Sequence, residues 1–267
     1  MRKIKELISL SGRSALITGA SGHLGRSMAF ALSELGADLI LVDIDSQKLD
    51  ELHKELEALF QNNLTVISCD LSMEIERKQL IESIIHDYDQ LNILINNAAY
   101  VGTSNLNGWS TNFELQNQDS WRDCIEVNLT AVFHLCQGFY PLIKISEGAS
   151  IINIASIYGQ LGPDWSLYDG TSMGNPAAYS ASKGGLIQLT RWLATTISPL
   201  VRVNSISPGG IERGQPDIFI DKYRLKTPLK RMASEDDLIG AVAYLASDLS
   251  SYVTGQNITI DGGLSIW

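Results

Sequence analysis

Short apolar runs alternate with longer segments of helical period along most of this chain, and this alternation is the feature that most constrains its fold. Runs such as 15–17 and 151–154 contain hardly any polar residue, as strands buried on both faces of a sheet require. Segments such as 46–60 repeat apolar residues every three to four positions, as amphipathic helices do. Strands that alternate with helices form βαβ units. We therefore predict an α/β fold, a doubly wound parallel sheet of about seven strands flanked by helices.

The expected elements follow one another without a linker or repeat, so we predict a single domain over residues 1–267. Strands are predicted over 14–18, 38–42, 64–68, 91–95, 149–155, 201–206 and 258–260. Helices are predicted over 23–35, 46–60, 73–88, 119–145 and 178–198. Two polar segments, 100–118 and 159–176, interrupt this rhythm and are expected to form loops.

Charge and cysteine content exclude several classes of function. The formal net charge is -10 and no basic run offsets it, so we expect no binding to nucleic acid or to an anionic membrane surface. Cys69, Cys124 and Cys136 form no Cys-x-x-Cys pair, which favours reduced thiols in a cytoplasmic protein and no metal site. The first apolar stretch is short and interrupted by Glu6, so we predict neither a signal peptide nor a membrane span.

A glycine-rich turn joins the first predicted strand to the first predicted helix. Glycines permit a tight turn and close approach of the backbone to a ligand, and the N-terminus of a helix presents free N–H groups to an anion. We therefore predict that this turn binds the phosphates of a dinucleotide. The contacts expected here are Gly19, Ser21, Gly22, His23, Leu24 and Gly25. For His23 two interpretations remain, contact with the pyrophosphate or packing against the protein.

Two acidic residues end neighbouring predicted strands. Asp43 lies 18 positions after Gly25, where a carboxylate accepts hydrogen bonds from the adenosine ribose and repels a 2′-phosphate. Arginine and lysine are absent from 42–46, so we predict NAD rather than NADP. The alternative for Asp43 is a turn or helix cap. Asp70, followed by Leu71, is predicted to contact the adenine region, with a simple cap as its alternative.

The fourth predicted strand ends in a run of asparagine and alanine at the same edge of the sheet. Asparagine side chains can tie strand ends together, and small residues let a dinucleotide lie flat on the backbone. We therefore expect Asn97, Ala98 and Ala99 to support the edge and to contact the cofactor through their backbone.

Tyr179 and Lys183 lie four positions apart on a predicted helix and share one face. A neighbouring ammonium favours the phenolate, so we expect the pKa of Tyr179 to be lowered from its usual value of about 10. Such a pair supplies an acid and base usable near neutral pH.

Together these motifs resemble the short-chain dehydrogenase/reductases of the classical type, over nearly the whole chain. The matching features are the turn 18–25, Asp70, the run 96–99, Asn128, Ser156, Tyr179 with Lys183, Pro208 with Gly209, Thr254 and Asp261 to Gly263. The resemblance implies a Rossmann fold with one NAD(P)-binding domain. It also implies a homodimer or homotetramer that packs through the helices 119–145 and 178–198.

The resemblance also implies catalytic roles. Tyr179 would exchange a proton with the substrate oxygen, and Lys183 would lower the pKa of Tyr179 and bind the nicotinamide ribose. Ser156 would form a hydrogen bond with the reacting oxygen, and Asn128 would position a water molecule of the proton relay.

Three departures from the family pattern stand out. His23 occupies a position of the turn where the family usually has glycine. Ser156 and Tyr179 lie 23 positions apart, about twice the usual separation. Pro208 and Gly209, expected to line the nicotinamide, are followed by a loop that lacks the threonine that often bonds the carboxamide. The backbone of Ile211 is expected to take over this contact.

The loops 100–118 and 159–176 are expected to flank the substrate. They contribute Tyr100, Trp109, Trp165, Tyr168, Asn105, Asn107, Asn112, Asp164 and Asp169. Aromatic rings with many fixed polar groups suit a polyhydroxylated ligand, although the rings could instead anchor the loops. We predict an NAD-dependent oxidoreductase that transfers a hydride between nicotinamide and a secondary alcohol or ketone on a sugar or nucleotide-sugar. The segment 156–179 resembles oxidoreductases of flagellin and surface-glycan modification. The alternatives are a 3-oxoacyl carrier-protein reductase and a non-catalytic NAD-binding scaffold.

Overall fold

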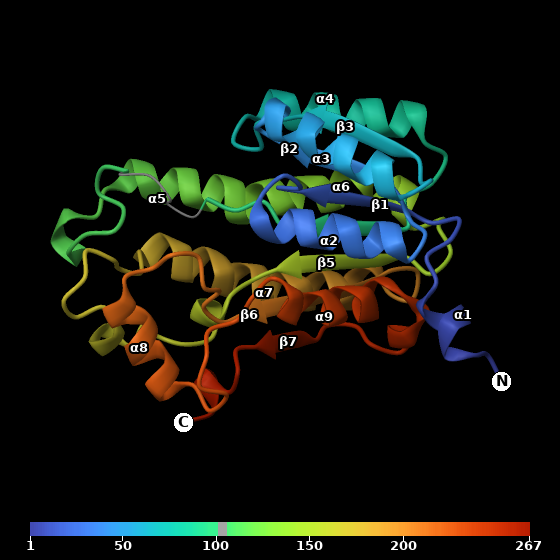
Figure 1. The fold of residues 1–267 in the computed structure, drawn as a ribbon. Helices are drawn as coiled ribbons and strands as arrows, with labels where there is room; N and C mark the ends of the chain where they lie inside the picture. The colour runs from blue at the N-terminus through green and yellow to red at the C-terminus, as the bar shows by residue number, and fades with distance from the viewer. Residues whose placement is uncertain (101–105) are drawn as a thin grey trace.

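The computed structural model describes residues 1–100 and 106–267, and its centre is a sheet of seven parallel strands (Figure 1). The strands are β1 (Ser14–Thr18), β2 (Asp38–Asp43), β3 (Leu64–Ser68), β4 (Ile93–Asn96), β5 (Ser150–Ile154), β6 (Arg202–Pro208) and β7 (Asn257–Ile260). Their order is β3-β2-β1-β4-β5-β6-β7, so the direction of winding reverses between β1 and β4. The predicted doubly wound sheet is confirmed, and ligands of such sheets bind where the order reverses.

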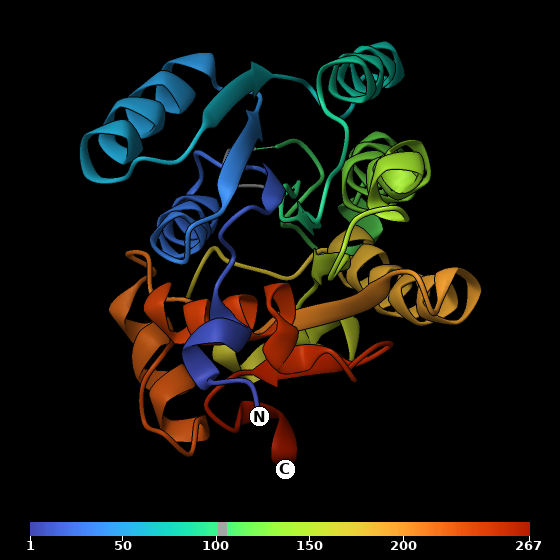
Figure 2. The ribbon, with the colours of Figure 1, turned by 90° about the vertical axis from the view of Figure 1, so that its right-hand side faces the viewer.

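Helices cover both faces of the sheet (Figure 2). They are α1 (Ile4–Ile8), α2 (His23–Glu34), α3 (Ser46–Leu59), α4 (Glu74–Asp87), α5 (Gln118–Ile125), α6 (Ala131–Ile143), α7 (Ala177–Ile197), α8 (Asp217–Lys226) and α9 (Asp236–Ala246). One face packs against α2, α3 and α9, and the other against α4, α6 and α7. Of the helices within the described residues, none has both the length and the apolar character needed to cross a membrane.

Strands β1 to β6 each supply side chains to two separate cores. Leu16 of β1 and Ile151 of β5 join the core beneath α4, α6 and α7. Ala15 of β1 and Ile152 of β5 point the other way, into the core beneath α2, α3 and α9. This double burial explains why the strands read as continuous apolar runs rather than as alternating ones.

The predicted helix 119–145 is not continuous. A π-helical turn, Glu126–Thr130, separates α5 from α6 and contains the buried Asn128. The Asn128 side chain accepts a hydrogen bond from the Tyr100 N–H at 2.6 Å and donates one to Ser182 Oγ at 3.1 Å. A widened turn of this kind often marks a functional position within a helix.

A third, smaller core lies at one end of the molecule, where the sequence predicts only loops. It joins α8 to the segment 159–176 (Figure 1) and contains Leu167, Tyr168, Phe219, Ile220, Tyr223 and Met232. Lys222 of α8 also donates hydrogen bonds to the backbone oxygens of Ser166, at 3.0 Å, and Asp169, at 2.6 Å. The segment 159–176 is therefore fixed to α8.

Candidate active site

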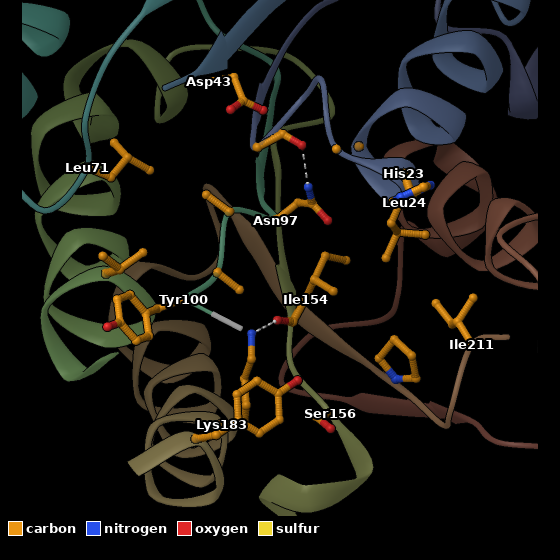
Figure 3. Close-up of a pocket in the computed structure, with 18 of the residues that line it drawn as sticks. His23, Leu24, Asp43, Leu71, Asn97, Tyr100, Ile154, Ser156, Lys183 and Ile211 are labelled. Atoms are coloured by element: carbon orange, nitrogen blue, oxygen red, sulfur yellow. Dashed lines mark hydrogen bonds between the residues drawn. The ribbon is translucent and has the colours of Figure 1, made fainter. Parts of the chain in front are cut away.

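A cavity of about 1160 Å³ opens at the carboxyl edge of the sheet, where the strand order reverses. It exceeds the range of roughly 300–1,000 Å³ typical of small-ligand pockets, as a dinucleotide site requires. All the predicted cofactor contacts except Ser21 line this cavity: Gly19, Gly22, His23, Leu24, Gly25, Asp43, Asp70, Leu71, Asn97, Ala98, Ala99, Tyr179, Lys183, Pro208, Gly209 and Ile211. Figure 3 labels His23, Asp43 and Lys183 among them.

The glycines between β1 and α2 let the backbone fold tightly beside β4. Gly19 has a φ of +63°, and a Cβ there would lie 2.8 Å from the Ala98 Cα. A Cβ on Gly25 would lie 2.0 Å from the Gly19 oxygen. The N-terminal turn of α2 therefore reaches the cavity wall, and its first N–H groups have no partner within the helix. This arrangement fits the phosphates of a dinucleotide.

His23 and Ser21 take different places in this turn. His23 is exposed and lines the cavity, so the interpretation that it packs in the protein is wrong. Ser21 lies outside the lining, but its N–H donates a hydrogen bond to Asp43 Oδ2 at 2.9 Å. Ser21 thus holds the carboxylate that was predicted to recognise the ribose.

Both acidic strand ends face the cavity and also organise their own turns. Asp43 Oδ1 accepts a hydrogen bond from the Ile44 N–H at 2.8 Å. Asp70 Oδ1 accepts hydrogen bonds from the Ser72 N–H at 2.9 Å and from Ser72 Oγ at 2.7 Å. Neither residue caps the following helix, because α3 and α4 begin after Asp45 and Met73. Asp43 and Asp70 therefore stabilise their turns and also face the cavity, so a role in the turn does not exclude contact with the cofactor.

Asn97 ties the ends of β1 and β4 together. Its Nδ2 donates to the backbone oxygens of Thr18, at 3.0 Å, and Gly19, at 2.9 Å (Figure 3). Its own N–H donates to Thr18 Oγ1 at 3.0 Å. The side chain therefore supports the edge as expected and leaves the backbone of Ala98 and Ala99 along the cavity.

Ser156, Tyr179 and Lys183 converge on the inner end of the cavity. Ser156 follows β5, and the other two lie one turn apart on α7. The Lys183 Nζ lies 5.7 Å from the centre of the Tyr179 ring. It donates a hydrogen bond to the Ile154 backbone oxygen at 2.7 Å (Figure 3). The fold thus brings these three residues together from two elements far apart in the sequence.

The expectation of a lowered tyrosine pKa is wrong for this structure. Burial raises the pKa of Tyr179 above its usual value, and hydrogen bonding to Ser156 opposes this rise only in part. Burial also lowers the pKa of Lys183, to about 8. Because the ammonium is itself desolvated and bonded to Ile154, the protein alone does not preform a phenolate.

Asn128 does not line the cavity. Its side chain joins the end of β4, through Tyr100, to Ser182 on α7. Ser182 Oγ in turn donates to the Tyr179 backbone oxygen at 2.8 Å. Asn128 therefore fixes the helix that holds Tyr179, and its contact with a water molecule remains a prediction.

A second cavity, of about 810 Å³, adjoins the first. Both are lined by Ser156, Met173, Tyr179, Gly209 and Gln215. A ligand in the second cavity would therefore meet the catalytic candidates from the side opposite the dinucleotide turn. The arrangement suits a substrate that exchanges a hydride with a cofactor.

The predicted substrate loops supply only part of the second cavity. Asn107, Trp109 and Tyr168 line it, and Tyr100 lines the first cavity. Of the other predicted residues, Asn112, Asp164, Trp165 and Asp169 line neither cavity, and Asn105 lies outside the described residues. The carboxylate of Asp164 instead forms an ion pair with Lys226 of α8.

Several lining residues were not predicted as site residues: Tyr158, Met173, Arg213, Gln215 and Tyr223. Arg213 belongs to the loop that lacks the family's threonine, and its Nε donates to Glu235 at 2.8 Å. The Ile211 oxygen accepts a hydrogen bond from Gln215 at 2.7 Å, and no hydrogen bond among the described residues uses the Ile211 N–H. This N–H is available for the predicted carboxamide contact. The missing threonine was the one sequence signal pointing to this loop.

Comparisons with known proteins show the family to which the chain belongs. A family model described as enoyl-(acyl carrier protein) reductase matches residues 19–265. The chain is 32% identical over 264 residues to the 3-oxoacyl-(acyl-carrier-protein) reductase FabG of Thermotoga maritima, covering 96% of this chain and 99% of that protein. The chain belongs to the short-chain dehydrogenase/reductase family. It is therefore an oxidoreductase, and the expectation of an enzyme rather than a scaffold is confirmed.

Solved structures of similar fold carry both nicotinamide cofactors. An NADP active-site complex of RhlG from Pseudomonas aeruginosa has a TM-score of 0.83 at 28% identity, with 97% of this chain and 98% of that one covered. An NAD⁺-bound xylitol dehydrogenase has a TM-score of 0.84 at 26% identity, with 95% and 99% covered. This short-chain dehydrogenase/reductase thus has the fold of enzymes that bind a nicotinamide cofactor.

Proposed function

We propose that this short-chain dehydrogenase/reductase transfers a hydride between NAD and a secondary alcohol or ketone of a sugar or nucleotide-sugar. The observation that carries the proposal is the position of Ser156 and Tyr179, which line both the dinucleotide cavity and the adjoining cavity. When bound, the nicotinamide supplies the hydride chemistry. We assign this activity to one cofactor-binding domain over residues 1–267.

The protein side chains then handle the proton and the substrate oxygen. Ser156 forms a hydrogen bond with the reacting oxygen, and Tyr179 exchanges a proton with it. Lys183 would hold the nicotinamide ribose, and Asn128 would keep α7 in place and position a water molecule for the proton relay. Asp43, already held by Ser21, supports NAD over NADP because a second negative charge at the ribose is unfavourable.

The lining of the second cavity supports a substrate with many oxygens. Its polar side chains are Asn107, Ser110, Ser172, Asn175 and Gln215, and its aromatic ones include Trp109, Tyr158 and Tyr168. Fixed polar groups beside flat rings suit a carbohydrate, and the proposal includes sugars of flagellin or surface-glycan modification.

A 3-oxoacyl carrier-protein reductase is the second candidate, because the FabG relative and the matching family model carry names of that kind. A carrier-protein partner is acidic and needs a complementary basic surface. The net charge of -10 on this chain is unfavourable for such a partner.

Surface features support a homo-oligomer. Large apolar side chains are exposed on the helices expected to pack between subunits: Trp121 on α5 (42% exposed), Phe133 on α6 (42%) and Trp192 on α7 (54%). We propose a dimer or tetramer built through these helices. The free, buried thiols of Cys69, Cys124 and Cys136 support a cytoplasmic location.

Turnover by purified protein tests the proposal. NAD is supplied with a panel of sugars, sugar phosphates and nucleotide-sugars, and acyl thioesters with NADH or NADPH form a second panel, both followed by NADH or NADPH absorbance. We expect turnover on the first panel and a loss of about 10²- to 10⁴-fold in kcat for Tyr179→Phe. Tyr252→Phe, at a fully exposed tyrosine, is the matched control. Turnover of acyl thioesters alone, or an unchanged Tyr179→Phe enzyme, contradicts the proposal.

A further inference from the structure

Two tyrosine hydroxyls meet at the wall of the second cavity. Tyr158 lies two positions after Ser156, in the short helical turn Ile157–Gly159 that follows β5. Tyr168 comes from the long segment between Ser156 and Tyr179. Their hydroxyl oxygens are 2.5 Å apart, and both residues line the cavity beside Ser156 and Tyr179.

The hydrogen-bond inventory of this pair is incomplete. Two phenols carry two hydroxyl hydrogens, and the bond between them uses one. Within the described residues, the two hydroxyls are hydrogen-bonded only to each other. One hydrogen and several lone pairs are therefore left over, and polar groups in such buried positions usually have partners. Burial raises the pKa of both tyrosines, so the pair stays neutral and keeps both hydrogens.

The pair is also held in place by packing and by hydrogen bonds of the neighbouring backbone. The Tyr168 ring packs against Phe219 of α8, with ring centres 5.4 Å apart. The Tyr168 backbone oxygen accepts a hydrogen bond from Thr171 Oγ1 at 2.8 Å, and Lys222 donates to the next backbone oxygen, that of Asp169, at 2.6 Å. A donor fixed in this way can select a ligand atom without first being ordered.

We propose that the Tyr158–Tyr168 pair binds a second oxygen of the substrate, other than the oxygen attached to the reacting carbon. The inference rests on the proposed function, whose sugar substrates carry such further oxygens, and it names the two side chains that bind one of them. This assigns a role to the additional residues between Ser156 and Tyr179, because they place Tyr168 within hydrogen-bond distance of Tyr158.

A matched pair of small alcohols tests this inference. The probes are trans-cyclohexane-1,2-diol and cyclohexanol, each with NAD, and the readout is the ratio of their kcat/KM values. The wild-type enzyme is expected to prefer the diol. Tyr158→Phe and Tyr168→Phe each keep the ring and remove one hydroxyl, and each is expected to lower the ratio about 3- to 10-fold. The ratio is insensitive to a general loss of active protein.

Trp165→Phe is the control for packing. Trp165 also packs against the Tyr168 ring, with ring centres 5.7 Å apart, but lines neither cavity. We expect this variant to keep the wild-type ratio. A wild-type enzyme without preference for the diol overturns the inference, as do tyrosine variants with an unchanged ratio. If both alcohols are turned over with equal kcat/KM, the inference about the tyrosine pair is rejected and the proposed function stands. If no compound of the sugar panel is turned over, the proposed function is rejected.

Discussion

At the scale of single residues, Asp43 is positioned before any ligand binds. Its two oxygens accept hydrogen bonds from the N–H groups of Ser21 and Ile44, so the carboxylate already stands at the cavity wall. Binding of a ribose then requires no further loss of conformational entropy to order this carboxylate, because folding has already ordered it. The carboxylate is thus both a support of the glycine turn and the proposed determinant of cofactor choice.

Replacing Asp43 by serine should weaken the preference for NAD. The change removes the negative charge that disfavours a 2′-phosphate. It also replaces the carboxylate by a shorter side chain with one hydroxyl, which weakens the hydrogen bond to the ribose. We expect the ratio of kcat/KM for NAD over NADP to fall at least 10-fold, about 1.4 kcal/mol. Asp45→Ser is the matched control, because Asp45 caps α3 and does not line the cavity. An unchanged ratio in Asp43→Ser would remove the basis for NAD selection.

Lys183 should make the stability of the cofactor-free protein depend on pH. Burial lowers the pKa of Lys183 from 10.5 to about 8, so the unfolded chain binds this proton more tightly than the folded one. Between pH 8 and 10.5 the contribution of Lys183 to the free energy of unfolding therefore rises with pH, by up to about 1.4 kcal/mol per pH unit.

Denaturant unfolding of wild type and Lys183→Met at several pH values isolates this contribution. The difference in unfolding free energy, wild type minus variant, is expected to increase as the pH rises through this window. The tyrosines and cysteines with raised pKa values are common to both proteins and cancel. A difference that stays constant with pH would show that the lysine is not desolvated.

At the scale of elements, the β1–α2 turn depends on the absence of a side chain at Gly25. Gly25→Ala should force the first turn of α2 and the Gly19–Ala20 backbone apart, because its Cβ would lie 2.0 Å from the Gly19 oxygen. We expect a loss of stability of about 1–3 kcal/mol and weaker binding of NAD, measured by thermal unfolding and calorimetric titration. Gly240→Ala in α9 is the control, since nothing lies within 4 Å of its added Cβ. That variant is expected to be as stable as wild type or more so.

The elements also show where prediction from sequence succeeds and where it stops. The turn, Asp43 and the β-strands were predictable because local sequence determines them: glycine spacing, strand ends and apolar runs. The packing of α8 and the contact between Tyr158 and Tyr168 could not be predicted, because they depend on contacts between segments distant in the chain. The prediction of a lowered pKa for Tyr179 was wrong for the same reason. Burial of this side chain depends on the whole fold, and its effect on the pKa outweighs that of the nearby lysine.

At the scale of the whole molecule, the exposed aromatic side chains of α5, α6 and α7 are expected to be covered by a second copy of the chain. Trp192→Glu would place a charge in that contact, so we expect sedimentation to show a smaller species than the wild-type protein. Leu59→Glu, at the end of α3 and 67% exposed, is the control and is expected to sediment as wild type. A monomeric wild-type protein would contradict this packing.

The small core beneath α8 has a consequence for how such enzymes diversify. It is separate from the two cores that bind the sheet to its helices, and it holds the wall of the second cavity. We expect that residues 159–176 and α8 can be exchanged together as one cassette, provided that Tyr223, which accepts a hydrogen bond from the Gly210 N–H, is kept. Replacing this cassette by that of a relative with different specificity is expected to change the range of substrates while the cofactor site is kept.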